Sequence, residues 1–199
     1  MKIELLSQST GYPITLFDVK DHLRIPRGQT NEDEYLTSLL LTATRRAEQI
    51  TGRKLRLQTY KLYLDKWPDT DSIELPFYPV HNVPSSGIVY KNSDGDSTTF
   101  SSTGWLADTV SEPGRVCLEY DSQWPAVTLH NVNPISVEFR TGSTSSTGVE
   151  DTIKHAIKLM VGGWYENRED QLIVPAGQSI QELPKGVMSL LASERRSWF

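Results

Sequence analysis

Apolar residues follow a helical spacing at both ends of this chain and a strand-like spacing in the middle. One helix face is indicated by Leu36, Leu39, Leu40, Ala43, Ala47 and Ile50. A second is indicated by Ile153, Ala156, Ile157, Met160, Val161 and Trp164. Between them, residues 56–64 alternate apolar and polar side chains as a half-buried strand does. The pattern predicts an α+β protein, a small bundle of two N-terminal and two C-terminal helices with an inserted antiparallel β-rich region.

The first two helices have recognisable ends. Thr15 is placed as an N-cap with Asp18 at the third helical position, and Pro26 stops the first helix. The second helix is predicted to open at Asn31 and to end at Gly52, a residue type that readily takes the left-handed conformation after a helix.

The middle of the chain reads as several short strands separated by turns. The predicted strands span residues 56–64, 73–75, 87–91, 98–100, 115–120 and 135–140. Asp94-Gly-Asp96 is better read as a hairpin turn than as a calcium loop, because no bidentate glutamate follows at the required spacing. We therefore expect an N-terminal helical pair over 1–54, a β-rich insertion over 55–140, and a C-terminal helical pair and tail over 141–199 that completes one bundle with 1–54.

The C-terminal helices carry two features of their own. Gly162 and Gly163 lie beside the apolar stripe and would allow another element to approach closely. Each glycine costs about 1 kcal/mol of helix stability, because glycine has a low helix propensity. The last helix carries Val187, Leu190 and Leu191. The chain then ends in a cationic and aromatic tail, which either folds back on its own helices or inserts into a groove of a partner.

Composition narrows the class of protein. The 199 residues contain 37% apolar side chains, enough for a core but below the globular average. The net charge of -5 argues against a general nucleic-acid binder, which needs a basic surface to displace counterions. The single cysteine, Cys117, fits a reducing compartment, and the N-terminal apolar run is too short for a signal peptide. We expect a soluble protein without a membrane partner that stays in the cytoplasm where it is made.

No pattern of catalytic residues is evident. The four histidines are scattered, with no second ligand type at metal spacing, and Cys117 lies in a strand pattern without a nearby histidine. The sequence contains no nucleophile elbow, P-loop or dinucleotide fingerprint. We predict that the chain is not an enzyme and binds neither a metal nor a cofactor.

Three short motifs, taken with the order of helices and strands, carry a resemblance to a known family. They are Thr51-Gly-Arg53 after the second helix, Glu74-Leu-Pro76 with Pro79-Val80 in the β part, and Gly163-Trp-Tyr-Glu-Asn-Arg168 at the end of the third helix. In this order they resemble the head–tail connector (adaptor) proteins of long-tailed bacteriophages and prophage-derived particles, across nearly the whole chain.

The resemblance implies a ring of about twelve copies below the portal protein, joining the DNA-filled capsid to the stopper or tail-completion protein. DNA would pass through the lumen without sequence-specific binding, and an acidic wall would repel its phosphates. The implied location is the virion neck, assembled in the bacterial host cytoplasm. By the same resemblance, the subunit bundle and lateral contacts are assigned to Leu36, Leu40, Ala43, Ile157, Met160 and Trp164. Portal docking is assigned to Leu190, Leu191, Arg195, Arg196, Trp198 and Phe199.

Two other readings remain open. The chain could be another neck or tail-completion protein, which would also be β-rich but would not need helical pairs at both ends. It could also be a soluble enzyme or ligand-binding domain whose groove is lined by Trp105, Trp124 and Tyr120. Large aromatic residues at such positions more often belong to a core.

Overall fold

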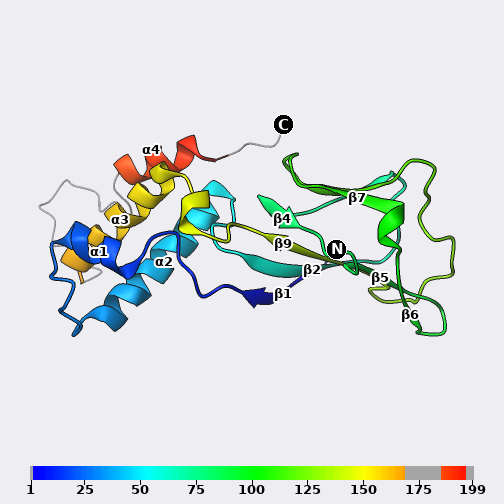
Figure 1. The fold of residues 1–199 in the computed structure, drawn as a ribbon, viewed down its shortest axis with the longest axis horizontal. Helices are drawn as coiled ribbons and strands as arrows, with labels where there is room; N and C mark the ends of the chain where they lie inside the picture. The colour runs from blue at the N-terminus through cyan, green and yellow to red at the C-terminus, as the bar shows by residue number, and fades with distance from the viewer. Residues whose placement is uncertain (1, 169–184, 196–199) are drawn as a thin grey trace, which may run out of the picture. The chain divides into compact units, whose positions relative to one another are not determined.

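The chain divides into a β unit and a helical unit, and it passes between them three times. The β unit comprises residues 1–10 and 56–144, and the helical unit comprises residues 11–55 and 145–199. The computed structural model describes residues 2–168 and 185–195 (Figure 1). The predicted α+β class, a helical bundle with an inserted β region, is confirmed.

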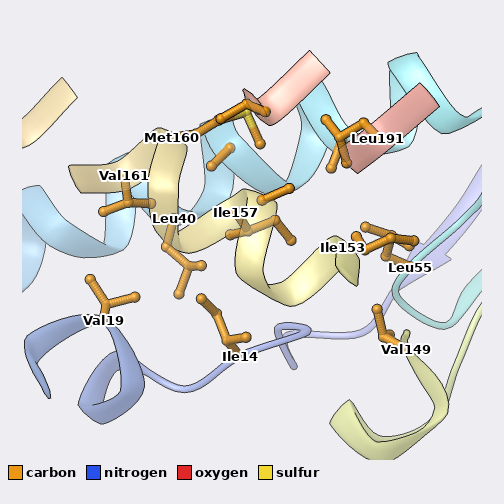
Figure 2. Close-up of a cluster of buried hydrophobic side chains, with 14 of the residues drawn as sticks. Ile14, Val19, Leu40, Leu55, Val149, Ile153, Ile157, Met160, Val161 and Leu191 are labelled. Atoms are coloured by element: carbon orange, nitrogen blue, oxygen red, sulfur yellow. The ribbon is translucent and has the colours of Figure 1, made fainter. Parts of the chain in front are cut away.

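Four α-helices form the helical unit in the described part of the chain. They are α1 (Leu16–Leu23), α2 (Asp33–Thr51), α3 (Asp151–Glu166) and α4 (Lys185–Ser193). Their apolar faces meet in one core, which contains Leu40 of α2, Ile157 of α3 and Leu191 of α4 (Figure 2). Val187 of α4 belongs to the same cluster. Complete burial of so many aliphatic side chains is the main stabilising contribution to this unit.

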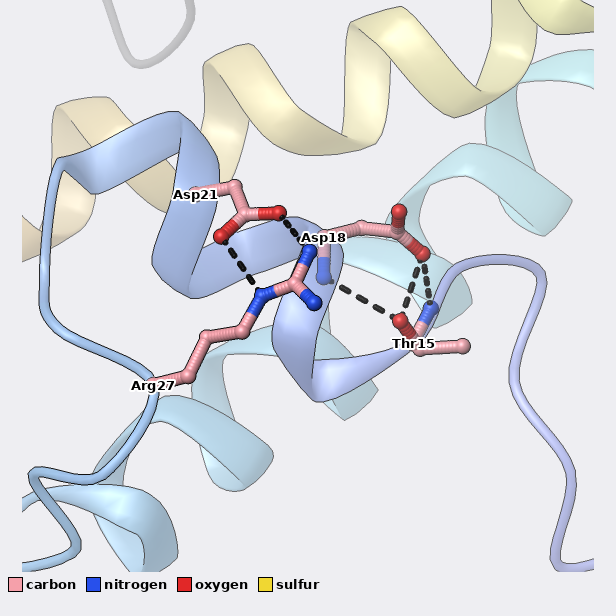
Figure 3. Close-up of polar contacts among 4 residues, drawn as sticks. All are labelled: Thr15, Asp18, Asp21 and Arg27. Carbon is pink, nitrogen blue, oxygen red and sulfur yellow. Dashed lines mark hydrogen bonds and ion pairs between the residues drawn. The ribbon is translucent and has the colours of Figure 1, made fainter.

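The helix ends follow the sequence closely, with one exception. Thr15 caps α1 in a full capping box: its Oγ1 accepts from the Asp18 amide at 3.1 Å, and its own amide donates to Asp18 Oδ2 at 2.8 Å (Figure 3). Gly52 ends α2 with φ 74°, as predicted. The prediction of Asn31 as the cap of α2 was wrong: Glu32 holds that position, and its side chain makes no capping bond.

Two antiparallel sheets form the β unit. The larger has the order β1-β2-β9-β5-β6, and β4 pairs with β9 alongside β5. The smaller has the order β3-β8-β7. The bounds are β1 (Lys2–Gln8), β2 (Gln58–Leu64), β3 (Ser72–Glu74), β4 (Val80–Asn82), β5 (Ile88–Lys91), β6 (Ser97–Thr99), β7 (Trp105–Asp108), β8 (Arg115–Leu118) and β9 (Ile135–Thr141).

Strand register places the large apolar side chains of the β unit on one face. Tyr60 lies opposite Phe139 and Leu62 lies opposite Val137 across the β2–β9 pair, and all four are buried. Val116 of the smaller sheet belongs to the same core. The alternating pattern over residues 56–64 therefore indicated both the strand and its buried face.

Three strands were missing from the sequence prediction. Residues 2–8, which the sequence grouped with the N-terminal helices, form β1 at the edge of the larger sheet. Its side chains are mostly exposed and show no alternation, so the pattern gave no strand signal. The other two, β4 and β7, have the sequences Val80-His-Asn82 and Trp105-Leu-Ala-Asp108, and neither alternates apolar and polar residues.

Candidate functional site

The three aromatic residues considered for a groove have unlike environments. Trp105 is buried in the core of the β unit. Trp124 stacks on Trp67 with ring centroids 4.9 Å apart and donates its Nε1–H to the Thr70 carbonyl. Tyr120 is 88% exposed. They do not form the common wall that a ligand groove in this unit would need.

The described residues also provide no cluster suited to metal binding. Among residues 2–168 and 185–195, no group of three or more His, Cys, Asp or Glu side chains is arranged to hold an ion. Within the same ranges, none of the helices combines the length and apolarity needed to cross a membrane.

The residues assigned to the bundle and lateral contacts lie in the core of the helical unit. Five of them are almost fully buried there: Leu36, Leu40, Ala43, Ile157 and Met160. Trp164 is half-buried and packs against the same cluster. These side chains hold the subunit's own helices together, so a lateral contact would have to use the outer helix faces.

The residues assigned to portal docking are divided by the structure. Leu191 is fully buried in the helical core, and Leu190 is partly buried and packs against this core. Arg195 is exposed just beyond α4. Arg196, Trp198 and Phe199 lie outside the described residues.

The Gly163–Arg168 motif forms a polar clamp between the end of α3 and the start of α2. Tyr165 donates its hydroxyl to Glu32 Oε2 at 2.6 Å, and Arg168 pairs with Glu32 Oε1 at 2.5 Å. The guanidinium of Arg168 also lies over the rings of Tyr35 and Tyr165, with its carbon 4.9 and 5.1 Å from their centroids. Two distant segments of the chain are thereby joined through a charged group held between aromatic rings.

The clamp changes the acidity of its members. The Tyr165 hydroxyl and then the Arg168 guanidinium stabilise the carboxylate, so the pKa of Glu32 is lowered. The same carboxylate raises the pKa of Tyr165. Glu32 therefore stays ionised and Tyr165 stays protonated at neutral pH, which suits a permanent structural contact better than proton transfer.

The Thr51–Arg53 motif joins three helices of the same unit. Thr51 bonds back to the Ala47 carbonyl at 2.8 Å, and Gly52 turns the chain. Arg53 then pairs with Glu150, just before α3, at 2.8 Å, and lies 3.8 Å from Glu194 after α4. Only 11% of the Arg53 side chain is exposed, so solvent screens this arrangement weakly.

The third motif fixes the junction of the two sheets in the β unit. Leu75 is buried and its amide donates to the Gly114 carbonyl at 2.8 Å. The Pro79 carbonyl accepts from the Thr141 hydroxyl at 2.9 Å and from the Gly142 amide at 2.8 Å. A side chain at Gly114 would collide with Val80. All three motifs are thus structural contacts, two in the helical unit and one in the β unit.

The sequence reasoning missed a buried lysine that organises the α1–α2 connection. Lys20 is 1% exposed, and its Nζ donates to the Gln29 carbonyl at 2.6 Å and lies 2.5 Å from Asp33 Oδ1. Lys20 follows Val19 on the apolar side of α1, where the helical period would have marked it as inward-facing.

Comparison with known structures gives full-length matches. A chain in the neck of an empty gene transfer agent (GTA) particle, computed with C6 symmetry, has a TM-score of 0.78 and 24% identity. A chain in the virion of the native GTA particle has a TM-score of 0.76 and 22% identity. A chain in the neck of the native GTA particle, computed with C12 symmetry, has a TM-score of 0.74 and 22% identity. Each match covers 100% of this chain and 97% of the other.

The chain shares its fold with these GTA particle proteins. The likeness includes the β unit as well as the helices, because no part of the chain is left unmatched. No protein-family model matches the sequence, and no curated protein matches it either.

The net negative charge of the chain lies in the β unit. Its ranges contain seven Lys and Arg residues against twelve Asp and Glu residues, a net charge of -5. The helical unit contains thirteen of each and is neutral. The acidity of the whole protein is therefore a property of the β unit, where it can repel phosphates or attract a basic surface.

Proposed function

We propose that this chain is a structural subunit of the neck of a tailed phage or phage-like particle, and specifically a head–tail connector (adaptor). The observation that carries the proposal is the full-length likeness to chains of GTA necks at TM-scores up to 0.78. The structural contacts made by the sequence motifs also support a role in assembly.

The subunit would form a closed ring of about twelve copies below the portal protein. Neck structures computed with C12 and C6 symmetry support cyclic assembly for the similar chains. In such a ring, one face of each copy meets a different face of the next. The lateral contact would use the outer faces of α2 and α3, whose inner faces are occupied by Leu36, Leu40, Ala43, Ile157, Met160 and Trp164.

The C-terminal segment would dock on the portal protein. In the described part of this segment, Arg195 is exposed and Leu190 is half-buried, while Leu191 remains in the helical core. Arginine and large aromatic side chains are the types that dominate binding energy at interfaces, so Arg195, Arg196, Trp198 and Phe199 are the proposed docking residues.

The opposite end of the ring would meet the stopper or tail-completion protein, and DNA would pass through the lumen. The net charge of -5 in the β unit supports a passage on which phosphates do not stick. Assembly would take place in the host cytoplasm, and the finished protein would reside in the virion neck.

Electron microscopy of particles from a strain lacking this gene tests the proposal. We expect filled or leaking capsids separated from free tails, because the ring that joins them is missing. Normal tailed particles would contradict a neck role.

A further inference from the structure

Two strands of the β unit leave one side unpaired and carry exposed leucines. Among the described residues, β1 pairs with β2 alone and β7 pairs with β8 alone. Leu5 of β1 is 49% exposed, and Leu106 of β7 is 59% exposed. A strand edge presents a row of free N–H and C=O groups, which another strand can satisfy.

The other strands with a single partner, β3, β4 and β6, lack this combination, and Val80, the apolar residue of β4, is buried at 6% exposure. The outer strand β6 consists of Ser97-Thr98-Thr99 and has no apolar side chain. The outer strand β3 has one, Ile73, which is buried at 4% exposure. Natural proteins protect edges by keeping them short and polar, so the apolar edges of β1 and β7 are the exceptions that call for a partner.

The β1 edge leaves the core of the larger sheet partly open. Leu5 lies opposite the buried Tyr60, on the core face of the β1–β2 pair. Leu6, 43% exposed, lies where the register shifts. An added strand would cover Leu5 and extend the apolar face beyond β1.

Hydrogen bonds within the β7–β8 hairpin fix the conformation of its turn. Asp108 accepts from the amides of Val110 and Ser111 at 3.2 and 2.9 Å, and from Arg115 Nε at 3.1 Å. Hydrogen bonds from the Ser111 hydroxyl and amide, and from Arg115 and the Val110 amide, hold the pKa of Asp108 well below its usual range. Val110, at the tip, is 91% exposed, so an apolar side chain is presented by a turn that needs no ordering when it binds.

The two edges also carry opposite charge. Strands β1 and β2 contain Lys2 and Lys61 against Glu4, a net charge of +1. The β7–β8 hairpin contains Asp108 and Glu112 against Arg115, a net charge of -1. The β1–β2 pair is therefore positive within a unit whose net charge is -5. Charges of opposite sign favour contact between these two surfaces and disfavour contact of either with its own kind.

We propose that β1 of one copy pairs with β7 of the next copy, so that the β units join head to tail around the ring. This inference rests on the proposed function, which requires a heterologous contact that repeats. Within the β unit, β1 and β7 lie along opposite sides (Figure 1), the arrangement that such a contact needs. The larger sheet of each copy then continues into the smaller sheet of its neighbour.

A charge-swap rescue tests the pairing in particles assembled from the full chain. Leu5→Arg alone and Leu106→Asp alone are each expected to reduce the number of tailed particles at least tenfold, because a charge replaces a leucine at the junction. The double variant is expected to recover most of them, since the two new charges face one another. Val132→Asp, at a 64% exposed loop position of the same unit, is the matched control and should leave the number unchanged.

Photo-crosslinking identifies the occupant of the edge. With a benzophenone amino acid in place of Leu5, irradiated particles should yield a dimer of this chain, crosslinked to the peptide that contains β7. A crosslink to a different neck protein, or no crosslink from position 5, would overturn the pairing. A normal number of tailed particles with both single variants would overturn it as well. These results differ from a failure of the proposed function, in which deleting the gene would itself leave tailed particles normal.

Discussion

At the scale of single residues, several polar side chains are held in contacts with a specific structural role. Lys20 is a buried cation with a carboxylate and two backbone carbonyls around it. Arg53 and Arg168 each join segments from different helices. Removing one member of such an arrangement leaves the remaining groups without their partner, which costs more than the contact itself contributes.

Lys20→Ala is expected to lower the free energy of unfolding by about 3 kcal/mol, because Asp33 and the carbonyls of the α1–α2 connection lose their buried cation. Urea unfolding followed by circular dichroism measures the change. Lys154→Ala removes a lysine whose partner, Asp151, is 97% exposed, and should cost less than about 0.5 kcal/mol. Equal effects of the two substitutions would contradict a special role for Lys20.

The capping box of α1 gives a pH-dependent contribution (Figure 3). The hydroxyl and amide of Thr15 bond to the Asp18 carboxylate and lower its pKa below 3.8. Because the folded-state pKa is depressed, the stabilisation is present above pH 3.8 and is lost as the pH falls through the folded value.

Thr15→Ala is therefore expected to cost about 1 kcal/mol at neutral pH and progressively less in acid. Unfolding curves recorded between about pH 6 and 2 measure the difference between variant and parent. A difference that stays constant over this range would show that Asp18 does not act through Thr15.

The residue scale also shows the limits of reading contacts from sequence. Thr15 and Asp18 are three positions apart, so their capping box could be predicted from the residue types at these two positions. Glu32 and Arg168 are separated by 136 positions, and no local pattern connects them. The helical period places Lys20 on the inner side of α1, but its carbonyl partners lie in a connection without regular structure, so the sequence did not show what this lysine would bind.

At the scale of helices and strands, the period of the apolar pattern determined what could be predicted. The 19 residues of α2 and the seven residues of β2 and β9 are long enough to show their periods. The edge strand β1 lacks a period because most of its side chains are exposed. Its pairing with β2 joins residues that are 50 to 61 positions apart in the chain.

Gly114→Ala tests the junction of the two sheets. An added Cβ would meet Val80 of β4 and the Asp108 carbonyl, so either β4 or the β7–β8 hairpin must shift. We expect a loss of about 2 kcal/mol in the free energy of unfolding, measured in urea. Gly28→Ala, where the new Cβ meets nothing within 4 Å, should cost far less.

At the scale of the whole molecule, the length of a C-terminal deletion decides whether it tests docking or folding. Deleting residues from Leu183 onward would also remove Val187 and Leu191 from the helical core, which confuses docking with folding. A chain that stops after Arg195 keeps α4 intact.

This shorter truncation, of residues 196–199, is expected to leave the thermal unfolding midpoint unchanged and to reduce binding to purified portal protein at least tenfold. Truncation removes Trp198 and Phe199, the types of side chain that carry most interface energy. Surface plasmon resonance measures the affinity. Unchanged affinity would contradict the assignment of portal docking to residues 196–199.

The division of the whole molecule into two units was only partly accessible from sequence. The change of period near residue 55 marked where the β region begins, and the structure begins its main segment at residue 56. The first ten residues belong with the β unit because β1 completes its larger sheet. The spacing of apolar residues could not identify the surfaces used in assembly, because it marks side chains that are buried in the subunit's own core. The residues assigned to lateral contact are of this kind.

A cryo-electron microscopy reconstruction of the neck of the intact particle tests the central claim most directly. We predict a cyclic ring of about twelve copies of this chain between the portal protein and the tail. A head–tail joint whose density is fully accounted for by other chains would contradict the account.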